Sequence, residues 1–321
     1  MSERSHRQLR HAALFAVASL LLAACSRGPL VPDGASAATE PDGPPPRPAV
    51  EDAGNGTTAT PASSSTVPTD DGLVWSDEFD GDALGPDWGL ETPLLGSGDA
   101  SVHIYQPEAI SVGEGVLRIE ATRLPEALQI DDDSDGVVDR TITWQSGFIT
   151  TRGHVEFLHG RFEARARAPE GQGLWPAIWL RPLDRVYGWW PRSGEIDVME
   201  MLGHDPGTAH TTAHWWNDGH RFDPLGHPLT PTDDGFHVFA LEWTPDELVW
   251  TIDGEEVRRL DEWTTDLGDG AAPFDQAFYL NINLAVGGSW PGDPDDTTPD
   301  GAAFEVDWIR VYQTAEHAGQ S

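Results

Sequence analysis

Three acidic residues lie close together in one short segment of the chain. Glu195, Asp197 and Glu200 fall in the run GEIDVME at residues 194–200. Crowded carboxylates repel one another when ionised, so their pKa values separate and one of them stays protonated near neutral pH. Such a group can supply an ionised nucleophile and, beside it, a proton donor that later acts as a base. The middle residue, Asp197, would orient the nucleophile and tune its ionisation.

The spacing of the three acids requires an irregular strand. Side chains alternate between the two faces of a β-strand, so Glu195 and Asp197 share a face while Glu200 points the other way. One extra residue in a β-bulge returns Glu200 to the acidic face, and bulges are frequent beside active sites. The two glutamate Cα atoms then lie roughly 13 Å apart. Side chains that lean together would bring the carboxyl groups to about 5 Å, which favours direct attack over attack by an intervening water.

Tryptophan residues accompany this run and help to interpret it. On spacing alone, the acids could equally form the solvated face of an edge strand in an acidic protein. However, Trp175, Trp179, Trp189 and Trp190 precede the acids closely, and the chain contains 14 Trp residues in all. Flat aromatic faces are surfaces on which sugar rings stack. The nearby tryptophans therefore favour an active site that binds carbohydrate over a solvated acidic face.

The elements that must position these residues are expected to be β-strands. Residues 161–167 alternate Arg or Glu with Phe or Ala, which is typical of a strand with one wet and one buried face. Residues 116–122, 236–243, 247–253, 278–286 and 304–312 also have strand patterns, and Asp253-Gly254 is a hairpin turn signal. No segment shows a long helical period. The sequence therefore predicts an all-β fold of two packed antiparallel sheets, a sandwich or jelly roll.

The overall charge excludes several classes of partner. The 321 residues carry a formal net charge of −35, with 19 basic residues, every one of them Arg, against 54 acidic residues. Such a field repels phosphate backbones and anionic lipids, so nucleic acid and charged membrane surfaces are not expected partners. Solubility in salty surroundings is the simplest explanation of the acidity. We expect a monomer.

The N-terminal region predicts export and anchoring. Three arginines precede an apolar stretch, residues 12–24, that is too short to span a bilayer. The stretch ends in LAAC, which resembles a lipoprotein cleavage site and predicts lipidation of Cys25, the only cysteine. An ordinary signal peptide followed by a chance cysteine is the alternative. We expect a signal peptide at 1–24, a flexible Pro/Ala/Ser/Thr-rich linker at 25–72, a folded domain at 73–314 and a disordered tail at 315–321. The protein would be held at the bacterial cell surface or outer membrane.

Several longer motifs, in order along the chain, carry a family resemblance. They are GRFEAR at 160–165, GQGLWPAIWL at 171–180, WPRSGEIDVME at 190–200, HTTAHW at 210–215, NINLAVGG at 281–288 and VDWIRVY at 306–312. Together they closely resemble the laminarinase branch of glycoside hydrolase family 16, over about residues 73–314. The resemblance implies a concanavalin-like β-jelly-roll sandwich with a substrate cleft across one sheet. It also implies retaining endo-hydrolysis of β-1,3-glucan or mixed-linkage β-1,3-1,4-glucan, with no cofactor for catalysis.

The matching positions imply roles for individual residues. Glu195 would be the nucleophile, Asp197 its assistant and Glu200 the acid/base. The expected substrate-binding residues are Trp175, Trp179, Trp190, His214 and Trp290. For each Trp a place in the core is the alternative, and for His214 a structural role within a strand.

The bulged spacing also resembles one part of the family more than others. Laminarinases, agarases and carrageenases share the longer form, whereas lichenases and xyloglucan-modifying members usually have one residue fewer. Galactan-cutting members often add basic residues for sulfate, which a chain at −35 without Lys does not favour. Neutral glucan is the expected partner. A galactan-cutting or transglycosylating enzyme and a non-catalytic glucan-binding module remain the alternatives.

Two calcium sites are expected, neither of them catalytic. Family members commonly bind one structural calcium, and the matching positions are Glu78 and Asp307, where a cation would tie the domain ends together. A second acidic segment matches positions 1, 3, 5 and 9 of an EF-hand-type loop with Asp131, Asp133, Asp135 and Asp139. Its twelfth position is Ile142 rather than Glu, so a partial calcium loop and an acidic solvated insertion both remain open.

Overall fold

A computed structural model of the chain describes residues 72–92, 94–96, 100–131, 137–268 and 270–313. The expected signal peptide, Cys25 and nearly all of the linker lie outside these residues, as do Asp133, Asp135 and the C-terminal tail. In the described part of the chain, no helix is long and apolar enough to cross a membrane.

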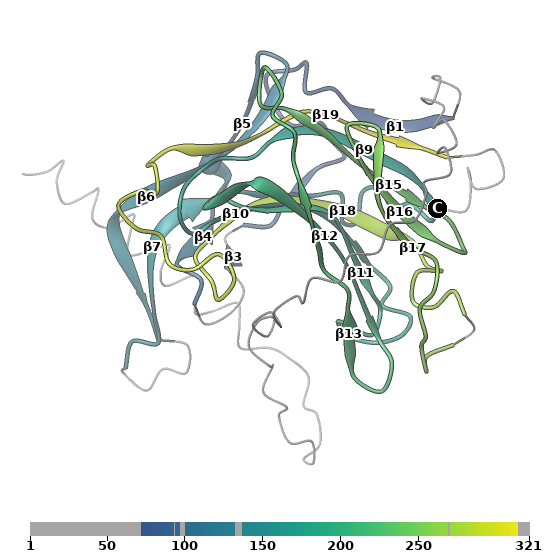
Figure 1. Ribbon diagram of the computed structural model, residues 1–321. Helices are drawn as coiled ribbons and strands as arrows, with labels where there is room; N and C mark the ends of the chain where they lie inside the picture. Colours follow the sequence, from purple (N-terminus) through teal and green to yellow (C-terminus); the bar gives the residue numbers. More distant parts are fainter. Residues whose placement is uncertain (1–71, 93, 97–99, 132–136, 269, 314–321) are drawn as a thin grey trace, which may run out of the picture. The chain divides into compact units, whose positions relative to one another are not determined.

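The described residues are built from β-strands and one short 3₁₀ helix, η1 (Pro107–Ala109) (Figure 1). The larger sheet has 11 strands in the described part of the chain, and its main path runs β17-β16-β15-β9-β19-β6-β7-β4-β3, with β1 beside β19 and β5 beside β6. Its strands are β1 (Leu73–Asp77), β3 (Leu94–Leu95), β4 (His103–Tyr105), β5 (Ile110–Gly113), β6 (Val116–Ile130), β7 (Arg140–Ser146), β9 (Gly160–Arg167), β15 (His237–Trp243), β16 (Leu248–Ile252), β17 (Glu255–Leu260) and β19 (Ala302–Tyr312).

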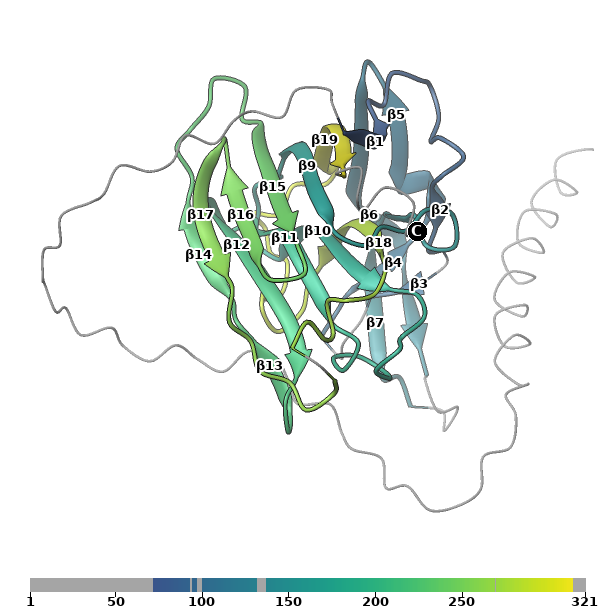
Figure 2. The same ribbon diagram turned by 90° about the vertical axis from the view of Figure 1, so that its right-hand side faces the viewer.

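The smaller sheet has 8 strands in the same described ranges, in the order β13-β12-β11-β10-β18-β8-β2, with β14 beside β12. They are β2 (Gly89–Leu90), β8 (Phe148–Thr150), β10 (Leu174–Pro182), β11 (Glu195–Leu202), β12 (Asp205–Trp216), β13 (His220–Phe222), β14 (Leu225–Pro228) and β18 (Phe278–Val286). Every pairing within this sheet is antiparallel. In the larger sheet β4 and β7 pair in parallel. Figure 2 shows the two layers after a quarter turn.

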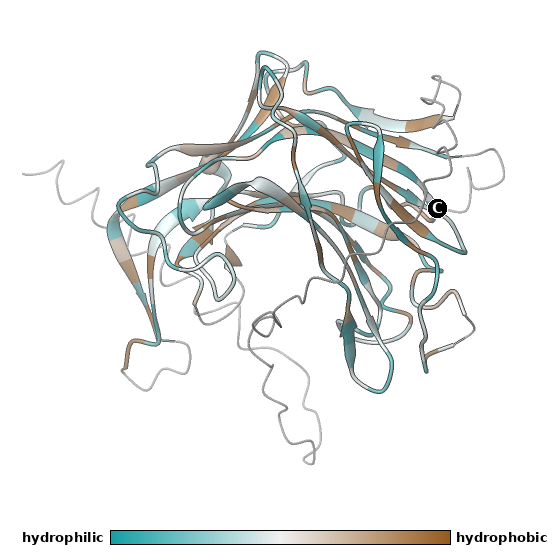
Figure 3. Cartoon of the chain, in the orientation of Figure 1, coloured by the Kyte–Doolittle hydropathy of each residue, from teal (hydrophilic) through white to brown (hydrophobic). Residues whose placement is uncertain are grey.

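Alternation of side chains creates the core between the two sheets. In β10, Leu174, Ile178 and Leu180 are almost completely buried, while Trp175 and Trp179 on the other face are half-buried. Large apolar residues of the larger sheet, such as Trp250 and Phe162, belong to the same buried cluster. Figure 3 shows apolar and polar residues alternating along many strands. Burying one face of each sheet leaves the other face of the smaller sheet free for polar chemistry.

The predicted all-β sandwich is confirmed, and so are the individual strand predictions. Residues 161–167 lie in β9, and the other five predicted segments overlap β6, β15, β16, β18 and β19. Asp253 and Gly254, at φ 51° and 83°, form the turn between β16 and β17. Both residues have positive φ, as the favoured two-residue hairpin turn requires. Strand β6 continues beyond the predicted end to Ile130, because it pairs with β7 again after a shift in register.

Candidate active site

A β-bulge in β11 is present where the spacing of the acids required one. On the β10 side, Met199 pairs with Ile178 and Asp197 pairs with Trp179, so Val198 is the extra residue. On the β12 side, Asp197 pairs with Thr212 and Glu200 with His210. Three steps along β11 therefore oppose two steps along β12, and the bulge is confirmed. It brings Glu200 to the face that carries Glu195 and Asp197.

A tryptophan of the opposite sheet supports this bulge from the core. Bulges interrupt the ladder of backbone hydrogen bonds and leave groups that need other partners. The carbonyl oxygen of Asp197 accepts a hydrogen bond from Nε1 of Trp250 at 2.9 Å, and the Trp250 side chain is fully buried. The larger sheet thus holds the backbone on which the acids are mounted.

Glu200 is held by two donors on neighbouring strands. Nε1 of Trp175 donates to its Oε1 at 3.1 Å, and the Thr212 hydroxyl donates to its Oε2 at 3.1 Å. Glu200 is buried, with 8% of its surface exposed. Both carboxylate oxygens are therefore oriented, while the site still has an opening to solvent.

Glu195 and Asp197 share a histidine. Nε2 of His214 lies 3.3 Å from Oδ2 of Asp197 and 3.8 Å from Oε1 of Glu195. On its other side, Glu195 lies 3.5 Å from Nε of Arg181, measured to Oε2. Asp197 is the more deeply buried of the two acids, at 3% exposed. Arg181 and His214 thus both lie beside Glu195, the acid that was expected to ionise.

Burial raises the pKa of all three acids, but not equally. The pKa of Glu195 rises to about 7, first because of burial and then because of the charge of Asp197, while His214 and Arg181 oppose the rise. Burial also raises the pKa of Asp197, against the charges of Arg258 and Arg181. The pKa of Glu200 is raised well above its ordinary value, because burial is reinforced by the charges of both neighbouring acids. Glu195, beside the cationic Arg181, is thus suited to the ionised role, and Glu200, between two acids, is suited to hold a proton.

Aromatic side chains line the same face of the smaller sheet. Trp290 packs edge-to-face against Trp175, with ring centroids 5.2 Å apart, and against His210 at 5.0 Å. Trp190 lies 5.7 Å from the ring of His214 and is 38% exposed. Trp179 donates from Nε1 to Oδ1 of Asn283 at 2.7 Å. The four tryptophans and His214, which were predicted to bind substrate, therefore lie around the acids rather than in the core.

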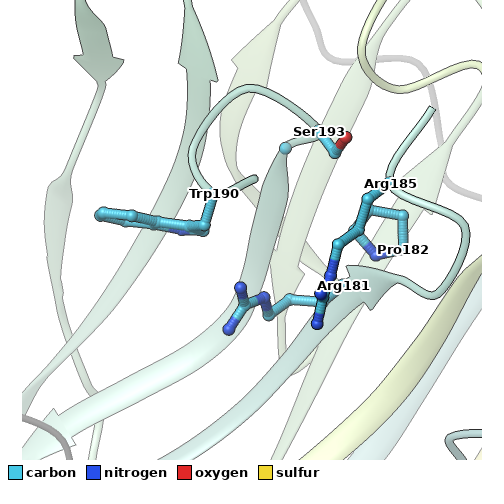
Figure 4. A pocket seen from close by; sticks show the side chains of 6 residues that line it. Arg181, Pro182, Arg185, Trp190 and Ser193 are labelled. Atoms are coloured by element: carbon cyan, nitrogen blue, oxygen red, sulfur yellow. The ribbon is translucent and has the colours of Figure 1, made fainter. Parts of the chain in front are cut away.

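The loop before β11 adds a small pocket at one end of the site. Arg181, Arg185 and Trp190 line it together with Pro182, Ser193 and Gly194, the residue just before Glu195 (Figure 4). Trp189 in this loop is 73% exposed, with the guanidinium of Arg185 over its ring at 4.2 Å. The loop thus presents aromatic and basic groups next to the acids.

Several residues of the site were not identified from the sequence. Arg181 and Thr212 each had a local signal, because they lie two residues from Trp179 and His214 and so share their faces. Trp250 had none, since it reaches the site from the opposite sheet.

The side chains predicted to bind calcium have other partners. Both oxygens of Glu78 contact Arg310, at 2.9 and 2.7 Å, and Asp307 contacts Arg165 at 2.6 Å. Calcium needs six to eight oxygen ligands, and oxygens already neutralised by arginine do not fit such a set. In the second segment, only Asp131 and Asp139 are described, and the backbone amide of Asp139 donates to the carbonyl of Ile130. Among the described residues, possible metal-ligand atoms of Glu195, Asp197 and His214 lie within 4.8 Å of one another. These three residues belong to the candidate active site and were not predicted to bind calcium.

Comparison with known proteins agrees with this geometry. The family model "Glycosyl hydrolases family 16" matches residues 101–310. A beta-glucanase of Rhodothermus marinus is 38% identical over 261 residues, which cover 76% of this chain and 86% of that protein. A glucan endo-1,3-beta-glucosidase of Cryptopygus antarcticus is 36% identical over 258 residues, covering 75% of this chain and 91% of that protein.

Solved structures show the same relationship. The catalytic domain of an endo-1,3-beta-glucanase (laminarinase) from Thermotoga petrophila superposes with a TM-score of 0.63 at 35% identity. The match covers 76% of this chain and 98% of that chain. The chain therefore belongs to glycosyl hydrolases family 16, and it is a glycoside hydrolase.

Proposed function

We propose that this protein hydrolyses β-1,3-glucan, or mixed-linkage β-1,3-1,4-glucan, at internal bonds with retention of anomeric configuration. The observation that carries the proposal is the bulge of β11, which brings Glu195, Asp197 and Glu200 onto one face. Aromatic side chains surround these acids, as a site for sugar rings requires.

The reaction uses the two glutamates in turn. Ionised Glu195 attacks the anomeric carbon, and Glu200 gives its proton to the departing glycosidic oxygen as that bond breaks. A covalent glycosyl-Glu195 ester results. Glu200, now ionised, takes a proton from water, and the water oxygen attacks the anomeric carbon and releases Glu195. The surroundings support these assignments, because Arg181 opposes the rise of the pKa of Glu195, whereas burial and the charges of Asp197 and Glu195 raise the pKa of Glu200.

The neighbouring residues support each glutamate in its role. Arg181 and His214 face Glu195 and favour its ionised form. Trp175 and Thr212 donate to Glu200 and stabilise the charge that it gains when it has lost its proton. Asp197, beside His214, keeps the nucleophile oriented.

The choice of a neutral glucan rests on charge and on relatives. Relatives at 33–38% identity are named beta-glucanase or glucan endo-1,3-beta-glucosidase. A chain with a net charge of −35 repels sulfated galactans. A glycan-binding module would have no use for two glutamates in the arrangement found here.

A substrate panel tests the proposal. Laminarin, lichenan, agarose and κ-carrageenan are offered to the wild-type protein and to Glu195→Gln, and new reducing ends are counted. We expect activity on laminarin or lichenan, lost by more than a thousandfold in the variant, since the covalent step is removed. Activity on none of the four, or activity that survives the substitution, contradicts the proposal. Products longer than a starting oligosaccharide would indicate glycosyl transfer instead.

We further propose that the protein is exported and held at the bacterial surface by lipid on Cys25. The LAAC run and the Pro/Ala/Ser/Thr-rich segment at 25–72 support this, the latter as a spacer between lipid and a monomeric domain at 73–314. Growth with a labelled fatty acid tests the anchor. Label should enter the wild-type protein and not Cys25→Ser. Label in both, or in neither, contradicts the lipid anchor.

A further inference from the structure

A second histidine lies directly behind His214. Nδ1 of His214 is 3.0 Å from Nε2 of His220. The two rings are nearly parallel, with centroids 5.2 Å apart and 25° between their planes. His214 is thus held on both sides, by His220 at one ring nitrogen and by the carboxylates of Glu195 and Asp197 at the other.

The hairpin of β12 and β13 places His220 there. Trp216 pairs with His220 and His214 pairs with Phe222, so the two histidines are diagonal neighbours on one face of the sheet. The ring of Trp190 packs edge-on against His220, with centroids 4.8 Å apart. His220 therefore has a fixed position that depends on the register of this hairpin.

The surroundings of His214 decide which of its nitrogens carries the proton. Its Nε2 faces two acceptor oxygens, one of which, Oδ2 of Asp197, is buried and makes no hydrogen bond of good geometry with the described residues. A lone pair on Nε2 would be repelled by both oxygens when the acids are ionised, which favours the tautomer with its proton on Nε2 without by itself excluding the other. In neutral His214 with this tautomer, Nδ1 is an acceptor, and the donor beside it is Nε2–H of His220.

We propose that His220 is a positioning residue that fixes His214 in the tautomer with its proton on Nε2, so that a donor always faces Asp197 and Glu195. This inference rests on the roles proposed above for the three acids. It adds a residue whose effect on the reaction passes through another side chain.

The same contact serves the charged form of His214. If His214 gains a second proton, its Nδ1–H donates to the Nε2 lone pair of the other neutral tautomer of His220. His220 itself stays neutral, because burial, followed by the charge on His214, lowers its pKa to about 4. The groups that face the pair are the three acids of β11 and, beyond Glu195, Arg181 of β10.

Two substitutions of His220 separate the hydrogen bond from packing. His220→Gln keeps an amide N–H near the position of Nε2, whereas His220→Phe keeps the ring against Trp190 but removes the donor. Phe222→Leu is the matched control, because Phe222 packs against both histidine rings, at 6.0 and 5.1 Å, without a hydrogen bond to either. We expect kcat on laminarin to fall about tenfold in His220→Phe, with KM within about twofold. His220→Gln should recover most of kcat, and Phe222→Leu should stay close to wild type.

The tautomer itself is read by NMR of protein labelled with ¹⁵N-histidine, with the His214 signals assigned by loss in His214→Asn. In wild type and His220→Gln, we expect a protonated Nε2 and an unprotonated Nδ1 on His214, whereas His220→Phe should show a mixture of tautomers. The NMR measurement needs no turnover, so it tests the proposed role of His220 even if the protein cleaves no glucan. An unchanged tautomer in His220→Phe overturns the proposal, and so does a loss of kcat that Gln does not reverse.

Discussion

At the scale of single residues, the site separates three similar acids by their surroundings. Burial raises the pKa of each, but Glu195 has Arg181 and His214 beside it, while the donors that the described residues offer to Glu200, Trp175 and Thr212, are neutral. Two carboxyl groups of one residue type thereby acquire opposite tasks. Substitutions of the neighbours, rather than of the acids, test this view most sensitively.

Arg181→Gln should move the acid limb of the pH profile. The charge of Arg181 lowers the pKa of Glu195, so its removal raises that pKa, and less of the nucleophile is ionised at a given pH. The acid limb of kcat/KM therefore shifts to higher pH, as rates measured from pH 4 to pH 9 would show. Arg185→Gln, in the same pocket, is the control and should leave the limb in place. An acid limb that stays fixed in Arg181→Gln excludes this role.

Trp175→Phe should weaken proton transfer by Glu200 while keeping an aromatic ring at this position. The indole N–H donates to Oε1 of Glu200, and a hydrogen bond to a charged group contributes about 1.5–3 kcal/mol. We expect kcat to fall by about tenfold or more. Trp179→Phe provides the comparison, because its N–H donates to Asn283 instead. Equal losses of kcat in the two variants would show that only aromatic packing matters.

At the scale of elements, one bulge determines which face Glu200 occupies. The extra residue Val198 leaves a backbone carbonyl at Asp197 that the buried Trp250 satisfies from the opposite sheet. An unsatisfied buried carbonyl costs about 1–3 kcal/mol, so the bulge depends on that contact.

Trp250→Phe should therefore affect both stability and catalysis. We expect the free energy of unfolding to fall by about 2–4 kcal/mol, from the lost hydrogen bond and the smaller ring, and kcat to fall as well. Trp243→Phe is matched in size and burial, and its N–H donates to the carbonyl of Phe274, outside the bulge. It should lose similar stability, measured by urea unfolding, but keep its kcat. A normal kcat in Trp250→Phe would contradict the claim that catalysis depends on the hydrogen bond from Trp250 to the bulge.

Much of this architecture could be predicted from local patterns, and the failures have one physical cause. Alternation identified β9, β18 and the acidic face of β11, and the excess residue in GEIDVME predicted the bulge. The roles of Trp250 and His220 depend on which strands lie side by side, a property of register that no single segment encodes. The contact of Glu78 with Arg310, which is distant in the sequence, was likewise not predictable from local patterns, and the calcium site at Glu78 stays a prediction.

At the scale of the whole molecule, the buried acids oppose folding. A carboxyl group with a raised pKa in the folded state binds more protons there than in the unfolded chain, so stability falls as pH rises. For Glu195, the loss begins near its ordinary pKa of 4.5 and is complete above its folded pKa of about 7. Burying the acids therefore makes the folded state less stable at neutral pH than it would be without them.

Glu195→Gln should consequently be more stable than wild type at high pH. The gain is expected to be up to about 3 kcal/mol at pH 8, to shrink as pH falls and to vanish near pH 4. Melting temperatures of both proteins across this range test it. Glu242→Gln, in β15, is an exposed control that should show no such trend. A difference between Glu195→Gln and wild type that is independent of pH would contradict the raised pKa.

The central claim is that Glu195 and Glu200 cleave a β-glucan by two successive displacements. Proton NMR of laminarin during the first minutes of hydrolysis tests it most directly, because the new reducing end is observed before it mutarotates. The account predicts that the β-anomer appears first and the α-anomer grows in later. Initial appearance of the α-anomer would mean attack by water opposite the leaving group and would contradict the role of Glu195 as nucleophile.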